Sequence, residues 1–312
     1  MSSPYTPKQV ANAIAVSESS VKRWCDKGLI PTHYTAGGHR RIELSGLVPF
    51  LKAKKVTLAK PELLGLPSNT GKGIRNIERA LEPYLEALVS GDEEQSRRIL
   101  LDLYLADHPL SEIFDRVIAP VFEKIGELWA CGSAEVYQER RACEVCMTIL
   151  RDSGTADGWQ ERRGCEITRR VIGELRSLVP QPAADAPVAI GAAPEGDQYN
   201  LATNMVELVL RDAGWNAMSL GDNIPLASMG EAIVAQQPRM FWLSCSHLVD
   251  ADSFVAQYNE LCEAHGNKVA FVVGGRALSE PIRQRMKHAA FCDTLTHLEA
   301  LAKTLETGGS QS

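Results

Sequence analysis

The stretch from residue 188 to residue 305 alternates short apolar runs with longer amphipathic ones, and no other feature constrains the fold of the chain as much. The short runs have the length and apolar content of buried strands; they lie at 188–191, 216–220, 240–244 and 269–273. The runs between them have helical length; they lie at 200–213, 226–236 and 250–265. This order predicts an α/β fold with a doubly wound parallel sheet, and it places a ligand crevice at the carboxyl ends of the strands.

The loops that follow the expected strands would line this crevice; they are 193–199, 221–225, 244–247 and 274–276. Cys245 and His247 share the third loop and are a candidate pair for an unusual ligand. Cys143 and Cys146 share one helical turn, a spacing that metal and redox sites use. They sit in the middle of an expected helix, however, and we interpret them as buried and inert, as we do Cys131 and Cys165. We therefore predict no metal site.

Two segments rich in proline and small residues divide the chain, and we interpret 61–73 and 179–187 as linkers. The part between them, residues 74–178, is helical in pattern; its candidate helices lie at 74–90, 93–106, 110–130 and 134–151. Helices of this length joined by short loops predict a four-helix bundle. The chain would then hold three domains and a tail, at 1–60, 74–178, 188–305 and 306–312.

The expected bundle contains a short internal repeat. The sequence of residues 138–144 recurs 22 residues later, at 160–166, with one residue changed. We interpret the repeat as a local duplication that inserts an extra helix and loop beside the cavity that the bundle would cover.

Positive charge is concentrated at the start of the chain. The first 60 residues hold ten Lys and Arg against three Asp and Glu, whereas the rest holds 23 against 36. A basic module on an acidic body is typical of a nucleic-acid-binding head. Thr6 and Ser17 predict the starts of two short helices, and Gly28 predicts the end of the second, 18–27. Two such helices form a helix-turn-helix, whose second helix fits the major groove of duplex DNA.

Several short motifs extend this reading: Thr-Pro at 6–7, the segments 20–24 and 28–31, and Gly-Gly-His-Arg-Arg-Ile at 37–42. On these motifs, residues 5–55 closely resemble the MerR family of winged helix-turn-helix transcription factors. The resemblance implies that the second helix meets base edges and that the two arginines of the wing hold the phosphate backbone. The candidate DNA-binding residues are Ser19, Ser20, Lys22, Arg23, Lys27, Tyr34, His39, Arg40 and Arg41.

Ser244 and the Gly274–Gly275 pair stand where the cobalamin-binding module has its serine and glycines, and residues 75–300 resemble that module. In it, a helical bundle covers the upper face of the corrin. With the MerR-like head, the whole chain resembles the CarH-type light-sensing repressors and their cofactor-free relatives. The candidate ligand-binding residues are Trp129, Glu139 and Arg140 in the bundle, and Asp197, Tyr199, Ser244, Cys245, His247, Gly274 and Gly275 in the crevice.

Two positions depart from the pattern of the cobalamin module. Tyr199 stands where the module has the histidine that ligates cobalt, and Arg140 stands where the bundle has a second histidine. A phenol that titrates at a pH of about 10 is a poor cobalt ligand, and a guanidinium cannot ligate at all. We therefore predict no cofactor, and the alternative is cobalamin or another tetrapyrrole held without a histidine ligand.

These observations predict a DNA-binding transcriptional regulator that is not an enzyme. We expect double-stranded DNA as its partner and a homo-oligomer formed through the bundle and the α/β body. The alternatives are a tetrapyrrole-binding photoreceptor regulator, a corrinoid carrier protein of a methyltransferase system, and an interaction module that binds DNA weakly. No run of 18 apolar residues occurs, which excludes a membrane span. The chain starts without a secretory signal, so we expect a cytoplasmic protein.

Overall fold

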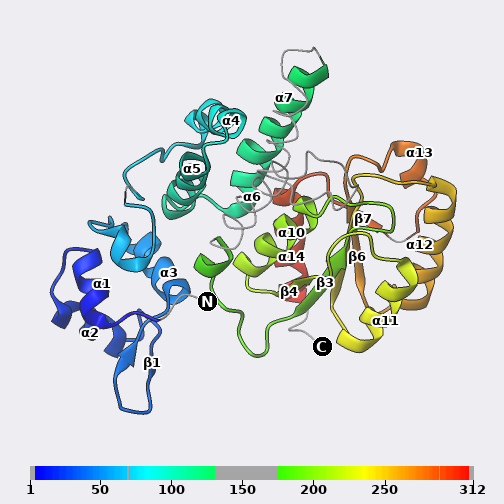
Figure 1. The fold of residues 1–312 in the computed structure, drawn as a ribbon. Helices are drawn as coiled ribbons and strands as arrows, with labels where there is room; N and C mark the ends of the chain where they lie inside the picture. The colour runs from blue at the N-terminus through cyan, green and yellow to red at the C-terminus, as the bar shows by residue number, and fades with distance from the viewer. Residues whose placement is uncertain (1–3, 69, 131–174, 288, 309–312) are drawn as a thin grey trace, which may run out of the picture. The chain divides into compact units, whose positions relative to one another are not determined.

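The structure is a computed structural model that describes residues 4–68, 70–130, 175–287 and 289–308. The described residues form two compact units; the first holds residues 4–68, 70–130 and 175–181, and the second holds residues 182–287 and 289–308 (Figure 1). Among the described residues, no helix is both long and apolar enough to cross a lipid bilayer.

The first unit begins with two short helices, α1 (Pro7–Ala13) and α2 (Glu18–Asp26). The side chain of Thr6 caps α1 and that of Ser17 caps α2, because each accepts a backbone N–H of the first turn. Gly28 follows α2 with a φ of 70°, the left-handed conformation that ends many helices. The structure therefore confirms the predicted helix-turn-helix.

A two-stranded antiparallel hairpin, residues 33–41, follows the helix-turn-helix; its strands are β1 (His33–Tyr34) and β2 (Arg40–Arg41). Helix α3 (Leu44–Lys54) then packs against α2, since the rings of Trp24 and Phe50 lie 4.8 Å apart between their centroids. We refer to residues 4–60 as the head.

The segment 61–73, whose composition predicts a linker, is packed against the head. It begins with a 3-10 helix, η1 (Pro61–Leu64). The hydroxyl of Tyr5 donates a hydrogen bond to the carbonyl of Leu64 at 2.7 Å, and Thr70 is fully buried. This segment therefore does not act as a free tether over the part that the structure describes.

A helical region completes the described part of the first unit; its elements are η2 (Ile77–Arg79), α4 (Leu81–Ser90), α5 (Glu93–Leu105), α6 (Leu110–Ile113), the π-helical turn η3 (Phe114–Ile118) and α7 (Ala119–Ala130). The expected helix 74–90 thus begins with a separate 3-10 turn. The expected helix 110–130 is a continuous helical run that contains a π turn. The fourth expected helix, 134–151, and the repeat lie outside the described residues, so the four-helix bundle stays a prediction.

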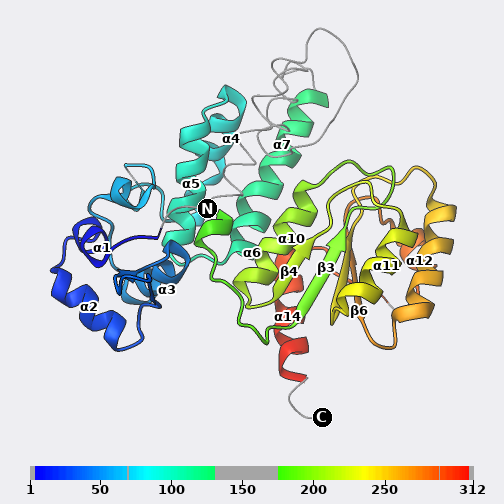
Figure 2. The same cartoon turned by 60° about the horizontal axis from the view of Figure 1, so that its bottom comes forward.

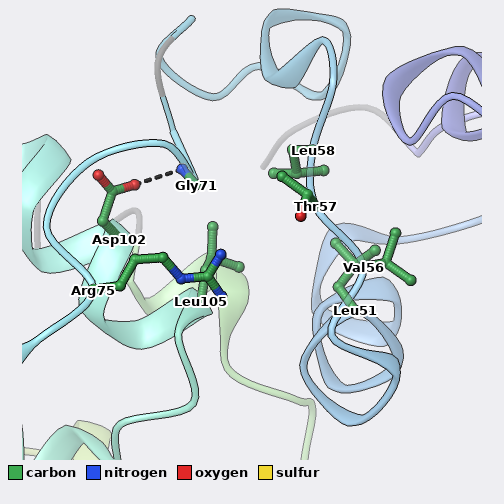
Figure 3. Close-up of a pocket in the computed structure, with 8 residues that line it drawn as sticks. All are labelled: Leu51, Val56, Thr57, Leu58, Gly71, Arg75, Asp102 and Leu105. Atoms are coloured by element: carbon green, nitrogen blue, oxygen red, sulfur yellow. Dashed lines mark hydrogen bonds between the residues drawn. The ribbon is translucent and has the colours of Figure 1, made fainter.

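A small pocket lies between the end of α3, the loop 71–75 and α5 (Figure 3). Asp102 of α5 lines it, is 1% exposed, and accepts the N–H of Gly71 on Oδ1 at 2.5 Å. Burial raises the pKa of Asp102 above its ordinary value, although the N–H groups of Gly71 and Gly73 and nearby arginines oppose the shift. The carboxylate therefore fastens this loop to α5.

A second contact joins the head to α5. The Nζ atom of Lys52 in α3 lies 4.0 Å from the ring centroid of Tyr104 and 3.6 Å from Oδ1 of Asp107. A partly desolvated ammonium over an aromatic ring is an attractive contact. The head and the helical region are thus packed together rather than merely connected.

The second unit is a five-stranded, wholly parallel sheet with the strand order β4-β3-β5-β6-β7. Its strands are β3 (Val188–Ala192), β4 (Asn216–Ser219), β5 (Met240–Ser244), β6 (Ala270–Gly274) and β7 (Ala289–Phe291). Its helices are α10 (Leu201–Asp212), α11 (Leu226–Gln236), α12 (Ala251–His265), α13 (Glu280–Arg283) and α14 (Leu295–Gly308). Helices α10 and α14 cover one face and α11 and α12 the other (Figure 2).

This architecture confirms the predicted doubly wound parallel sheet. The strand order reverses between β3 and β5, so a crevice at the carboxyl ends of these strands is the expected ligand position. The central strand β5 is buried at every residue, which fits its apolar sequence.

One large side chain fills the space between the sheet and α10. Trp242 of β5 is 1% exposed, and its Nε1 donates to Oγ1 of Thr203 at 2.9 Å. Gly191 of β3 is the register partner of Trp242. A Cβ at Gly191 would lie 2.2 Å from the indole ring and 2.3 Å from the carbonyl oxygen of Trp242. The glycine is therefore required by the protein's own packing.

We predict that Gly191→Ala lowers the free energy of unfolding of the second unit by about 1–3 kcal/mol, the usual cost of overpacking a core. The backbone oxygen of Trp242 cannot yield without disturbing the β3–β5 pair. Urea unfolding followed by tryptophan fluorescence measures the change.

The matched control is Gly230→Ala in α11, where the new Cβ meets no atom closer than the Cδ1 of Leu261 at 3.2 Å. Alanine is the better helix former by roughly 0.5–1 kcal/mol, which offsets the small shift that the Leu261 side chain must make, so this variant should lose much less stability than Gly191→Ala. Equal unfolding midpoints for the two variants would contradict the packing described here.

Candidate nucleic-acid interface and ligand crevice

The candidate DNA-binding residues all lie in or next to α2 and the hairpin. Six of them are exposed; they are Ser19, Lys22, Arg23, Lys27, Tyr34 and His39. Ser20, Arg40 and Arg41 are half-buried. The structure thus brings the predicted residues onto two elements that are in direct contact.

Several of these side chains are already engaged within α2. The hydroxyls of Ser19 and Ser20 each lie 2.9 Å from the hydroxyl of Ser17, the residue that caps the helix. The Nζ atom of Lys22 lies 2.8 Å from a carboxylate oxygen of Glu18, one helical turn earlier. These serines therefore help to cap the start of α2, and Lys22 forms an ion pair with Glu18.

Arg40 points toward α2 rather than into solvent. Its side chain is 18% exposed, and its Nη2 lies 2.6 Å from Oδ1 of Asp26. The neighbouring Arg41 donates from Nη1 to the carbonyl of Arg40 at 3.2 Å. The sequence did not predict a role for Asp26. Its position as an acidic residue at the end of a basic helix was the one available signal.

Asp197 organises the carboxyl edge of the sheet in the second unit, where the ligand crevice is expected. This carboxylate is fully buried, and its Oδ2 accepts the N–H groups of Ser246 and His247 at 2.5 and 3.1 Å. Its Oδ1 accepts the N–H of Tyr199 at 3.0 Å. Asp197 therefore holds the loop after β3 against the loop after β5, and its oxygens serve backbone donors rather than an open site.

Tyr199 and Arg276 face each other at the crevice. The guanidinium carbon of Arg276 lies 5.3 Å from the ring centroid of Tyr199, and its Nε donates to the carbonyl of Ser246 at 3.4 Å. Tyr199 is half-buried and Arg276 is exposed. Arg276 was not among the predicted site residues, although it directly follows Gly274–Gly275 in the sequence.

The structure separates the expected Cys245–His247 pair. Cys245 belongs to the hydrophobic core and is fully buried, which raises the pKa of its thiol. His247 is exposed. Because one side chain lies in the core and the other in solvent, the pair does not form a ligand site. Ser244 is 5% exposed and lies at the end of β5.

The glycine pair serves the packing of the protein backbone. A Cβ at Gly274 would lie 2.5 Å from the carbonyl oxygen of Cys292, and one at Gly275 would lie 2.2 Å from that of Cys245. Gly275 also has a φ of 116°, which side chains rarely adopt. Both glycines therefore allow neighbouring backbone segments to approach closely.

The candidate residues of the bundle are largely outside the described part of the chain. Glu139 and Arg140 lie outside it, as do Cys131, Cys143, Cys146 and Cys165. Trp129 lies in the last turn of α7, and the structure does not describe its side chain.

Two family models match the chain. A model described as a helix-turn-helix domain matches residues 4–55. A model described as a B12 binding domain matches residues 80–151, a range that begins just before α4 and continues past α7. No curated protein shows a significant match to the sequence.

One solved structure shares the fold of a large part of this chain, and two others match with lower TM-scores. The monomethylamine corrinoid protein of Methanosarcina barkeri matches with a TM-score of 0.55 at 14% identity, over 74% of this chain and 100% of that chain. A cobalamin-binding protein from Desulfitobacterium hafniense DCB-2 matches with a TM-score of 0.36 at 14% identity, over 74% and 99%. The methanol:cobalamin methyltransferase complex MtaBC of Methanosarcina barkeri gives 0.37 at 17% identity, over 82% and 92%. The chain therefore joins a helix-turn-helix domain to a body with a corrinoid-protein fold.

The residues at the position where the cobalamin module has its ligating histidine do not fit a cobalt ion held by a protein nitrogen. Tyr199 offers a phenol, and the guanidinium beside it would add positive charge next to a cationic metal. The glycines of the crevice approach the protein's own carbonyl groups. We therefore derive no chemical step that uses cobalt.

We predict that Asp197→Asn lowers the free energy of unfolding by about 1–3 kcal/mol, as expected when a buried hydrogen bond to a charged acceptor is lost. An asparagine must turn its NH₂ group toward one of the backbone N–H groups that Asp197 now accepts. Urea unfolding provides the measurement.

Asp222→Asn is the control, because Oδ2 of Asp222 accepts a single side-chain bond from Asn200 at 2.9 Å and an amide oxygen can take its place. We expect a change within about 0.5 kcal/mol there. If both variants lose the same stability, Asp197 does not organise the crevice.

Proposed function

We propose that this protein is a DNA-binding transcriptional regulator of the MerR type, with a winged helix-turn-helix head and a body that senses a signal or assembles copies of the chain. The observation that carries the proposal is the exposed basic surface of α2 beside the hairpin, to which Lys22, Arg23 and Lys27 contribute. In this proposal α2 enters the major groove and the hairpin, acting as the wing, follows the phosphate backbone.

The charge distribution supports duplex DNA as the partner. The first 60 residues carry a net charge of +7 within a chain whose net charge is −6. A local excess of positive charge binds phosphates and releases their counterions, whereas the acidic body has no such attraction. Binding should therefore be confined to the head and should weaken steeply as salt is added.

The body provides regulation by assembly rather than catalysis. Two copies, joined through the helical region and the α/β unit, would place their heads at a fixed spacing on DNA, and a signal that changes the assembly would change that spacing. We assign no catalytic step to the chain. The packing of α3 against α5 supports this arrangement, because it gives the head a defined contact with the helical region.

Binding of the intact protein to a duplex from its own upstream region tests the proposal. Fluorescence anisotropy across a salt series gives the slope of log K against log salt concentration. We expect Arg23→Ala and Lys27→Ala each to weaken binding and to reduce that slope by about 0.9, the value for one lost phosphate contact.

Lys268→Ala, which removes an exposed positive charge from the second unit, is the matched control and should leave both quantities unchanged. An intact protein that ignores duplex DNA at low ionic strength, or equal effects of all three variants, would refute the proposal.

A light-sensing regulator that binds cobalamin or another tetrapyrrole is the second candidate function, favoured by the match of residues 80–151 to a B12 binding domain. The poor fit of Tyr199 and Arg276 to a cobalt site disfavours it. Incubation with adenosylcobalamin, haem or biliverdin in turn, followed by desalting and a visible spectrum, separates the two candidates. The first candidate predicts a colourless protein; retention of a stoichiometric chromophore would show that the chain binds a tetrapyrrole, and a spectrum that changes on illumination would support light sensing.

A further inference from the structure

The Arg40 guanidinium is nearly saturated with hydrogen bonds inside the head. Nη2 donates to Oδ1 of Asp26 at 2.6 Å and to the hydroxyl of Tyr34 at 2.7 Å, and Nε donates to the same hydroxyl at 3.2 Å. Nη1 donates to the carbonyl of Lys22 at 3.0 Å. These bonds use four of the five N–H groups that an arginine has.

These partners come from two different elements. Asp26 and Lys22 belong to α2, whereas Tyr34 and Arg40 face each other across the hairpin as register partners. The guanidinium carbon also lies 5.5 Å from the centroid of the Tyr34 ring. Arg40 therefore joins the hairpin to the helix through charged and neutral hydrogen bonds at once.

The charge of Arg40 is compensated inside the head. The bonds to Tyr34 and Asp26 raise the pKa of the guanidinium, so it stays charged, and the Asp26 carboxylate neutralises it at short range. Only 18% of the side chain is exposed, against 62% for Asp26. One N–H group of Nη1 is left over, and a phosphate that took the two-pronged edge of the guanidinium would have to displace the Asp26 carboxylate already in place.

We propose that Arg40 is a positioning residue for DNA binding, which fixes the hairpin against α2 through Asp26 and Tyr34 and does not itself grip a phosphate. This inference rests on the proposed function, and it reverses the role that the sequence resemblance implies for Arg40. The phosphate contact of the hairpin falls to Arg41, and Asp26 becomes necessary for binding a polyanion although it is negative.

The sign of the Asp26→Ala effect distinguishes positioning from direct contact. Removal of a negative charge near DNA should strengthen binding if charge alone matters, and a freed Arg40 would add a phosphate contact and steepen the salt slope. The positioning role predicts the opposite, a loss of affinity of about tenfold, the size of one charge-assisted hydrogen bond. Glu62→Ala removes an exposed carboxylate of η1 as a control and should not weaken binding.

The complete set measures intact protein on duplex DNA for Arg40→Ala, Asp26→Ala, the double variant, Tyr34→Phe and Arg41→Ala, across a salt series. We expect Arg40→Ala to lower affinity with an unchanged salt slope and Arg41→Ala to lower the slope by about 0.9. The double variant should be no weaker than the worse single variant, because both remove the same contact. Tighter binding by Asp26→Ala, or a smaller slope for Arg40→Ala, overturns the inference.

A readout without DNA separates this inference from the proposed function. Hydrogen exchange of the free protein should accelerate at the amides of residues 33–41 in Arg40→Ala and Asp26→Ala but not in Arg41→Ala. If the parent protein does not bind duplex DNA and the exchange changes as described, the proposed function fails while the contact stands. Unchanged exchange in both variants overturns the positioning role.

Discussion

A basic surface recognises a duplex only if its parts keep a fixed geometry, and in this head Arg40 makes a directional contact between two of those parts. Helix α2 and the hairpin are elements of nine residues each, and Val21 of α2 and Ile42, which follows the hairpin, are fully buried apolar residues. The guanidinium of Arg40 supplies the directional contact, since its planar fork reaches Asp26 and Tyr34 together. Arg40 is therefore paired within the protein, and in the proposed function its positive charge does not contact DNA.

In the α/β unit, too, polar groups form hydrogen bonds with one another; these groups lie at the carboxyl edge of the sheet. Asp197 satisfies three backbone donors, and the Gly274–Gly275 turn packs against the carbonyls of neighbouring loops. On the face covered by α10, Trp242 occupies the space over Gly191. A fold shared with a corrinoid protein therefore carries an edge whose residues stabilise the protein itself, which fits a regulatory body better than a carrier of a reactive metal.

The features that the sequence predicts well are those set by neighbours along the chain. Thr6 and Ser17 cap the first turns of their own helices, and the apolar run 240–244 is long enough to mark a buried central strand. Strand β7 escaped prediction because Ala289–Phe291 is short and only partly buried, so its apolar signal is weak. Sequence patterns therefore predict the helix starts and the central strand more readily than the short edge strand β7.

The features that the sequence did not predict are contacts between distant residues. Arg40 of the hairpin reaches Asp26 of α2, and Arg276 meets Tyr199 of another loop at the carboxyl edge of the sheet. The sequence places the two loops at one edge, but it does not show which side chains pair in either contact. Cys245 looked available because it follows a strand, yet the hydrogen bond from its N–H to the carbonyl of Gly274 keeps the residue inside the core.

In the proposed function, paired heads of this protein read duplex DNA, and a hydroxyl-radical footprint of the intact protein on its own upstream region measures this pairing. We expect two protected segments on one face of the duplex, with centres about 10 base pairs or a multiple of that apart. Uniform cleavage at saturating protein and low ionic strength, or a single protected patch, would contradict this pairing.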